Sequence, residues 1–257
     1  MTLVLVKLGG SLITDKSRPY TVRQDVLDRL CTEIQQARLQ GGPSLLIGNG
    51  AGSFAHVSAQ RHRVHEGIGD EGSWEGFAEV HNDALRLNVM VREALTAAGV
   101  PAVTIQPSSS CITRSSRIHA FESGPIRRLL EAGLVPVVYG DVVVDEVQGC
   151  AIASTEEIFR HLASVLDPSR ILMVGQVDGV LDASGAVIPE ITRESLETVK
   201  RSLFASDAAA DVTGGMLHKI ERALETGVPT QILSGLEPGR IQRALLGESV
   251  PGTLVRG

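Results

Sequence analysis

The sequence predicts an α/β protein in which short buried strands alternate with amphipathic helices. Apolar runs that end in glycine turns, as at residues 3–6 and 44–47, are typical of buried strands. Between such runs the apolar residues recur at helical spacing, as over residues 26–39. The 27 glycines and the aromatic content of only 3% suit tight strand–helix turns. With 257 residues, 43% of them hydrophobic, the chain can bury one large core or two modest ones.

The composition argues against several classes of protein. With 24 basic and 30 acidic residues the net charge is −6, whereas a protein whose main partner is nucleic acid needs a basic face. No apolar run approaches the ~20 residues of a membrane helix, and the first residues do not resemble a signal peptide. Cys31, Cys111 and Cys150 show no CxxC spacing, which favours reduced thiols and argues against a zinc site. We therefore expect a soluble cytoplasmic protein with no nucleic-acid or membrane partner.

The first glycine turn combines features that suit a polyphosphate. Gly9 and Gly10 allow a phosphate to approach the backbone amides closely, and Ser11 adds a hydroxyl group. Lys7 at the end of the preceding strand and Lys16 beyond the turn supply two positive charges. The alternative is an ordinary strand-to-loop turn with two solvated lysines, because short glycine-rich motifs often occur without a ligand.

A second glycine loop, residues 48–56, follows the next predicted strand. Gly48 and Gly50 match the first two positions of the dinucleotide fingerprint GxGxxG, but Ser53 stands at the third, and no Walker A Gly-Lys-Ser/Thr follows. What remains is a cradle of backbone amides at a helix N-terminus, which suits an anion. His56 lies about one helical turn after Ser53 and can point back towards this cradle. Its alternative role is that of a surface or capping histidine.

A long helix is predicted over residues 74–95 from its apolar stripe. If this helix borders the ligand cleft, Phe77 and Val80 line an apolar pocket; otherwise the stripe is ordinary core. His81 and Asn88 are seven residues apart and share a face of the helix. They are candidates for hydrogen-bonded interior groups.

The middle of the chain continues the strand pattern. Further strands are expected at residues 100–105, 134–139, 142–144 and 150–153, with a polar loop over residues 106–110. Asp141 follows one of these strands and is either a turn residue or a ligand contact, because ligands of open α/β sheets bind at the carboxyl ends of the strands. Ser154 is a candidate N-cap for the next helix.

Near residues 166–168 the chain passes into a second lobe. A strand at residues 171–174 leads into Asp178 and Gly179, which form either a plain turn or a nucleotide-contacting loop. Residues 192–203 are predicted to be helical. Residues 211–219 combine a capping residue, two glycines and a lysine, which predicts a third helix N-terminus compatible with phosphate. The last strands are expected at residues 230–233 and 252–255.

Five motifs, taken together and in this order, resemble those of the amino acid kinase superfamily and, within it, of the isopentenyl phosphate kinases. They are residues 7–11 with 13–16, 50–56, 139–141, 177–179, and 211–215 with Lys219. The resemblance implies a three-layer αβα sandwich with a mainly parallel central sheet. It places a phosphoryl-acceptor lobe in residues 1–166 and a nucleotide-binding lobe in residues 167–257. It also implies ATP, Mg²⁺ and a homodimer.

The resemblance also implies roles for individual residues. The residues expected to bind ATP are Lys7, Gly9, Gly10, Ser11, Asp178, Gly179, Gly214 and Lys219. Those expected to bind the acceptor are Gly50, Ala51, Gly52, His56 and Gly140, with Phe77 and Val80 from the long helix. Those expected to act in the transfer are Lys7, Lys16, His56, Lys219 and Asp141, the last by organising the lysines. No protein ligand is assigned to the metal, which ATP oxygens and water would chiefly hold.

Three stretches depart from the pattern of the family. The acceptor loop usually reads His-Gly-Gly-Gly, whereas residues 49–52 read Asn-Gly-Ala-Gly, and the methyl group of Ala51 narrows the approach. The usual Thr-Asp is replaced by Gly-Gln at residues 175–176, and the usual Ser-Gly-Asp-Asp by Ser-Thr-Glu-Glu at residues 154–157. The last two differences bear on the nucleotide contacts more than on the acceptor site.

The activity implied is in-line transfer of a phosphoryl group from ATP to isopentenyl phosphate. An anionic phosphate oxygen needs no general base, so catalysis consists of positioning and charge neutralisation. His56 can share a proton with the acceptor, since a phosphate monoester has a second pKa near ~6 and histidine one near ~6.5. One alternative is another small anionic acceptor on the same fold, such as a fosfomycin-like phosphonate, UMP or a carboxylate. Another is a non-catalytic nucleotide- or anion-binding protein.

Overall fold

The computed structural model describes residues 2–68, 73–205 and 210–257, and in this part of the chain the main sheet has eight strands. Their order is β10-β12-β11-β9-β1-β2-β6-β3. They are β1 (Leu3–Leu8), β2 (Ser44–Asn49), β3 (Ala102–Thr104), β6 (Val135–Tyr139), β9 (Arg170–Gly175), β10 (Glu190–Thr192), β11 (Thr230–Ser234) and β12 (Thr253–Arg256). Neighbouring strands run parallel except for the antiparallel pair β11–β12. The prediction of a mainly parallel sheet is therefore confirmed.

Helices cover both faces of this sheet, which makes three layers. On one face lie α2 (Gln24–Leu39), α4 (Ser73–Ala97) and α10 (Arg240–Leu245). On the other lie α6 (Gly124–Glu131), α7 (Thr155–Leu166), α8 (Leu196–Ala205) and α9 (Ala210–Thr226). Side chains of β1 alternate between the two cores. Val4 and Val6 pack in the first core, and Leu3 and Leu5 pack in the second. The side chain of Lys7 therefore lies on the side of α7 and α9.

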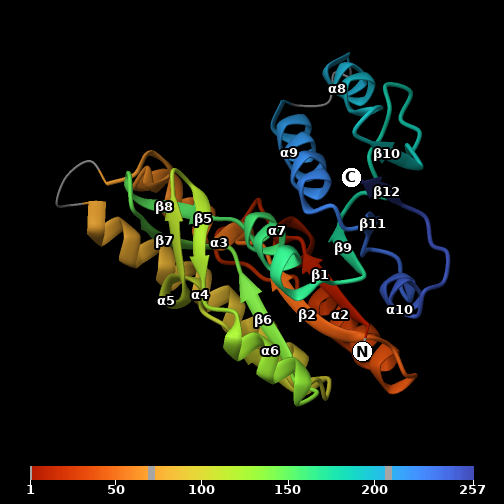
Figure 1. The fold of residues 1–257 in the computed structure, drawn as a ribbon, viewed down its shortest axis with the longest axis horizontal. Coiled ribbons are helices and arrows are strands. Elements are labelled where there is room, and N and C mark those ends of the chain that lie inside the picture. Colours follow the sequence, from red (N-terminus) through yellow and green to blue (C-terminus); the bar gives the residue numbers. More distant parts are fainter. Residues whose placement is uncertain (1, 69–72, 206–209) are drawn as a thin grey trace.

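A smaller sheet in the order β5-β4-β7-β8 lies at the opposite end of the molecule from α8 (Figure 1), and its strand β5 contacts α9 through the ion pair of Arg117 with Glu225. It consists of β4 (Cys111–Arg114), β5 (Arg117–Phe121), β7 (Asp141–Asp145) and β8 (Gly149–Ala153). Burial alone would raise the pKa of the Asp145 carboxyl. Hydrogen bonds from the backbone N–H groups of Ser116, Val147 and Gln148 outweigh burial and lower this pKa to about 2. This carboxylate joins the two hairpins of the small sheet.

Short helical segments connect the main elements. They are α1 (Gly10–Ile13), α3 (Gly52–Arg61), the 3₁₀ helix η1 (Val64–Glu66) and α5 (Pro107–Ser110). α1 and α3 begin inside the two glycine loops, so each loop is the entrance to a helix. The main sheet is continuous across the predicted lobe boundary at residues 166/167, because β1 pairs with β2 on one side and β9 on the other. The boundary itself stays a prediction.

Several local predictions were wrong. Residues 190–192 form β10, and the following helix begins at Leu196, so the predicted helix over residues 192–203 started too early. The predicted polar loop at residues 106–110 contains the one-turn helix α5. α9 begins at Ala210, which places Lys219 well inside the helix and not in a phosphate-binding N-terminal turn. The sequence patterns also missed β4, β5 and α10. Within the described residues no helix is both long and apolar enough to span a bilayer.

Candidate active site

A cavity of about 810 Å³ lies at the carboxyl ends of β1, β2, β6 and β9, where their loops converge. The predicted site residues that line it are Lys7, Gly9, Gly10, Ser11, Lys16, Gly50, Ala51, Gly52, His56, Val80, Gly140, Asp141 and Lys219. Phe77, Asp178 and Gly179 lie outside this lining, and the surroundings of Gly214 lie outside the described residues. The fold thus brings together residues from stretches that are more than a hundred positions apart.

The two glycine loops touch each other through their main chains. A Cβ atom at Gly10 would come within 2.6 Å of the Gly52 Cα, and one at Gly50 within 2.9 Å of the Gly10 nitrogen. Thr14 ties the loops together, because its hydroxyl donates to the Gly10 carbonyl at 2.7 Å and accepts from the Ser53 N–H at 2.9 Å. The backbone amides of both loops are therefore held at one side of the cavity.

The second loop leads directly into the amino end of α3. Gly52 has a φ of +55°, a conformation that glycine adopts readily, and a Cβ there would also meet the Thr14 methyl group at 2.6 Å. Gly52 and Ala55 of the first turn of α3 line the cavity, and a helix N-terminus favours an anion, although the Ser53 N–H already donates to Thr14 and the Phe54 N–H to the Ala51 carbonyl. His56 follows on α3, is exposed, and lines the same cavity. This arrangement matches the predicted cradle.

A buried ion pair stands at the centre of the cavity. The Lys7 ammonium group, on a residue only 7% exposed, pairs with the Glu156 carboxylate in the first turn of α7. Burial alone would raise the pKa of Glu156, but the charge and hydrogen bond of Lys7 and the charge of Lys219 keep that pKa below its ordinary value. Glu156 is therefore an ionised partner for the lysines. Its only signal in the sequence was its place at residues 154–157, where Ser-Thr-Glu-Glu replaces the usual Ser-Gly-Asp-Asp of the family.

Lys219 and Lys16 bring further positive charge to this cavity. Burial and the charges of Lys7 and Lys16 lower the pKa of Lys219, while Glu156 opposes them. Three ammonium groups from β1, the first glycine turn and α9 are thus close enough to act on one another. Such a cluster is stabilised when an anion binds between its members.

Asp141 does not organise the lysines, contrary to the prediction. Its buried carboxylate contacts the Nδ1 of His81 on α4 at 3.1 Å and accepts from the backbone N–H groups of Ser108 and Val142. The hydrogen bond from His81 to this carboxylate raises the pKa of the imidazole, and the charge of Asp141 adds to the effect. These partners draw Asp141 towards α4 and α5, so the lysine contact falls to Glu156. The prediction that His81 and Asn88 are hydrogen-bonded interior groups is confirmed.

One end of the cavity is apolar. Its apolar lining there is formed by Ala55, Ala59, Val80, Ala84 and Ile152, with the polar side chains of Gln60 and His65 beside them. Phe77 lies one helical turn before Val80 but packs against Trp74, with ring centroids 5.8 Å apart, and against a neighbouring core cluster. The predicted role of the long helix in lining a pocket therefore holds for Val80 but is not supported for Phe77.

The opposite end is lined by the loop after β9 and by α9. The residues there are Gly175, Gln176, Val177, Gly215, Met216 and His218. Asp178 turns away and pairs with Arg240, and a Cβ at Gly179 would meet the Thr253 hydroxyl at 2.6 Å. On this loop Gly175, Gln176 and Val177 therefore line the cavity, whereas Asp178 and Gly179 do not. In the described part of the chain no group of three or more His, Cys, Asp or Glu side chains is arranged to hold a metal ion.

Comparison with known proteins agrees with this geometry. The model of the amino acid kinase family matches residues 2–228. The isopentenyl phosphate kinase of Methanothermobacter thermautotrophicus is 37% identical to this chain, and the alignment covers 99% of each of the two proteins. That of Methanocaldococcus jannaschii is 33% identical, over 98% of this chain and 97% of its own length.

A solved structure supports the same relationship. An X-ray structure of isopentenyl phosphate kinase superposes with a TM-score of 0.83 at 33% identity, over 98% of this chain and 99% of that chain. The predicted resemblance and the αβα fold are confirmed. The chain belongs to the amino acid kinase family.

Proposed function

We propose that this protein transfers the γ-phosphoryl group of ATP to isopentenyl phosphate, giving isopentenyl diphosphate and ADP. Its full-length similarity to isopentenyl phosphate kinases supports this activity. The observation that carries the proposal is the convergence of Lys7, Lys16 and Lys219 with His56 on one cavity. Two polyanions repel each other, so a site that holds them in line needs an excess of positive charge.

The transfer is a displacement at the γ-phosphorus of ATP. An oxygen of the acceptor phosphate forms the new P–O bond, and the bond to the bridging oxygen breaks, which releases ADP. The lysines neutralise the charge of the transferring group, with Glu156 holding the Lys7 ammonium in place. The amides of Ala51 and Gly52 and the His56 imidazole hold the acceptor phosphate at the start of α3, whereas the Gly50 N–H is bound to the Leu8 carbonyl.

The apolar end of the cavity favours an isoprenoid acceptor over the alternatives. A five-carbon tail fits beside Ala55, Ala59, Val80 and Ile152 and loses its contact with water there. A carboxylate or a nucleotide acceptor calls for several hydrogen-bond donors, whereas most side chains of this region are aliphatic and Gln60 and His65 are the polar ones beside them in the described lining. A phosphonate antibiotic or UMP would therefore leave most of this aliphatic surface uncovered.

ATP would bring Mg²⁺ to the site, where the metal neutralises phosphate charge and helps orient the triphosphate. The Glu156 carboxylate is already engaged by Lys7, so the phosphate oxygens and water remain the main ligands. We also propose that the protein is a cytoplasmic homodimer. The three cysteines are buried and unbridged, which fits a reducing compartment.

A coupled assay of ADP release tests the proposal. We expect turnover with isopentenyl phosphate and dimethylallyl phosphate and little with fosfomycin, UMP or acetylglutamate. The variant His56→Gln should lose roughly 10- to 100-fold in kcat/KM for the acceptor, since a hydrogen bond to a charged group is lost. ATP binding, measured by calorimetry, should stay unchanged. An unaltered kcat/KM would remove His56 from the mechanism, and turnover of UMP or acetylglutamate alone would overturn the acceptor.

A further inference from the structure

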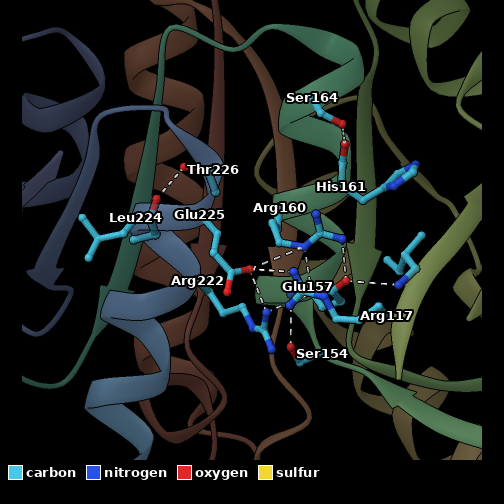
Figure 2. A network of polar contacts seen from close by, with 12 residues as sticks. Arg117, Ser154, Glu157, Arg160, His161, Ser164, Arg222, Leu224, Glu225 and Thr226 are labelled. Atoms are coloured by element: carbon cyan, nitrogen blue, oxygen red, sulfur yellow. Dashed lines mark hydrogen bonds and ion pairs between the residues drawn. The ribbon is translucent and has the colours of Figure 1, made fainter. Parts of the chain in front are cut away.

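Two neighbouring glutamates in the first turn of α7 face different partners. Glu156 faces the cavity and pairs with Lys7. Glu157 faces a group of arginines that lies between α7, β5 and α9 (Figure 2). Its side chain is only 5% exposed. A buried carboxylate is costly unless it is paired, so the arginines around Glu157 need an explanation.

The arginines connect three separate elements through Glu157 and Glu225. Arg160 of α7 donates to both carboxylate oxygens of Glu157, at 2.7 and 2.9 Å. Arg117 of β5 lies 3.2 Å from Glu157 and 2.7 Å from Glu225, while Arg222 of α9 lies 3.7 Å from Glu157 and 2.8 Å from Glu225. Figure 2 shows these side chains converging from the three elements on the two carboxylates.

Glu157 is held firmly from its own side of the network. Its backbone N–H donates to the Ser154 hydroxyl at 3.1 Å, which caps α7, and its carboxylate accepts from the Ile118 N–H of β5 at 3.1 Å. The carboxylate therefore has little freedom to move. It provides α7 and β5 with a fixed point against which α9 can be oriented.

α9 is the helix that carries Lys219. Arg222 comes three residues after Lys219, so the two side chains lie on adjacent turns of one helix face. Apolar contacts of Ile220 and Ala223 hold α9 in the same core as α7, but such contacts are not directional. Charged hydrogen bonds are directional, so the arginine network can set the rotation and axial position of the helix.

We propose that Glu157 is a positioning residue for Lys219. Through Arg117, which bridges it to Glu225, and through its longer ion pair with Arg222, Glu157 fixes α9 so that Lys219 meets Lys7 and Glu156 in the cavity. The first turn of α7 then acts on two lysines: Glu156 binds Lys7 directly, and Glu157 orients the helix that carries Lys219. The proposal rests on the proposed contact of Lys219 with the ATP phosphates.

A double-mutant cycle between Glu157→Gln and Lys219→Ala tests this role. In the wild-type background Glu157→Gln should raise the KM for ATP about tenfold and lower kcat, because a small displacement of a phosphate-binding group is costly. The KM for isopentenyl phosphate should change less than about twofold. In the Lys219→Ala background Glu157→Gln should change kcat/KM for ATP by less than about twofold, because its effect passes through the missing lysine.

Glu33→Gln is a matched control. Glu33 is also buried, pairs with Arg29 of its own helix at 2.6 Å, and accepts the Ile241 N–H of another helix at 3.2 Å. It lies on the opposite face of the sheet, among the elements of the first core. Thermal unfolding of both variants shows whether their loss of stability is comparable. The control should leave the KM for ATP unchanged.

Each outcome decides the proposal. Equal losses from Glu157→Gln with and without Lys219, or the same kinetic loss in Glu33→Gln, would reduce the network to a purely structural role. If Glu157→Gln does not fold, Arg117→Met takes its place in the cycle, because Arg117 bridges Glu157 and Glu225 and makes the short hydrogen bond from the network to α9. ATP affinity from calorimetry provides the same cycle without an acceptor. Suppose that ATP affinities show the expected coupling between Glu157 and Lys219 while isopentenyl phosphate is not turned over. That result would overturn the proposed function and support the positioning role.

Discussion

The acceptor side and the nucleotide side of the cavity differ in how tightly their loops are packed. On the acceptor side, the main chains of Gly10, Gly50 and Gly52 approach each other so closely that no Cβ fits between them. On the nucleotide side, a Cβ at Gly175 would meet no described heavy atom within 4 Å, and Asp178 is exposed and bound to Arg240. The backbone at the end of β9 is therefore less constrained than the two glycine loops, although Gly179 farther along packs closely against Thr253.

This difference explains where the sequence motifs are informative. Where two main chains touch, only glycine fits, so the residues at these positions identify the site. Where a loop opens to solvent, many residue types are compatible with the same backbone. The departures from the family pattern at Gly175 and Gln176 fall at the open end of β9. The departure at Asn49 falls on a buried residue that binds Asn88 and does not line the cavity, whereas the departure at Ala51 lies between Gly50 and Gly52 and lines it.

The substitution Gly10→Ala should have the largest effect. Its methyl group would be forced against Gly52 and Gly50, so the loops must move apart. We expect a loss of about 1–3 kcal/mol in the free energy of unfolding. We also expect a loss of at least about a hundredfold in kcat/KM for the acceptor, since the cradle is displaced. Urea unfolding and steady-state kinetics measure the two effects.

Gly175→Ala is the matched control for that substitution. The added methyl group enters open space, so kcat/KM should stay within about twofold of wild type. Similar losses of stability and of kcat/KM in Gly10→Ala and Gly175→Ala would mean that the glycine loops and the end of β9 are equally constrained.

Glu156→Gln should have the next largest effect. It leaves the buried Lys7 ammonium without its counter-charge, which costs about 3 kcal/mol of stability and lowers kcat. The folded-state pKa of Glu156 is lowered, so its contribution to stability is fully present above the unfolded pKa near ~4.3 and is lost as the pH falls through the folded value. The stability difference between wild type and variant should stay constant from about pH 8 to pH 5 and shrink below about pH 4. A difference that grew on acidification would contradict an ionised Glu156.

Ala59→Leu should sharpen the assignment of the apolar end. The larger side chain occupies space that the isoprenoid tail would fill. The KM for isopentenyl phosphate should rise roughly tenfold, while the KM for ATP stays within about twofold. Steady-state kinetics with each substrate varied in turn separate the two constants. A rise in the KM for ATP alone would place the nucleotide at this end.

Asp178→Asn should have the smallest effect. Its side chain is 58% exposed and pairs with Arg240 outside the cavity, so we expect a change in stability of at most about 1 kcal/mol. The value of kcat/KM for ATP should change less than about twofold. A large rise in the KM for ATP would restore the nucleotide contact that the sequence predicts for Asp178.

Most of the fold was predictable because β1, β2, β6 and β9 are continuous apolar runs, as expected for parallel strands buried on both faces. β4 could not be predicted in this way, because its burial does not follow the polarity of its residues. The apolar Ile112 is exposed, whereas the polar Thr113 is buried. β10 has only three residues and depends on pairing with β12, which no local pattern can indicate.

The candidate site was predictable in its glycines and lysines but not in its carboxylates. Asp141 follows Gly140 at the end of β6, Glu156 comes shortly after the end of β8, and sequence spacing does not decide which of them meets Lys7. That choice depends on His81, which engages Asp141 from α4, and on the entry of α7, which turns Glu156 to a lysine 149 positions away. Both are properties of the packed molecule.

The contact between the two glycine loops has one more consequence. Their spacing is set by main-chain atoms in contact, and therefore by the covalent dimensions of the backbone and not by the rotamers of side chains. If the two loops hold the two phosphates as proposed, substitutions at the apolar end of the cavity can change its shape without changing the distance between those phosphates.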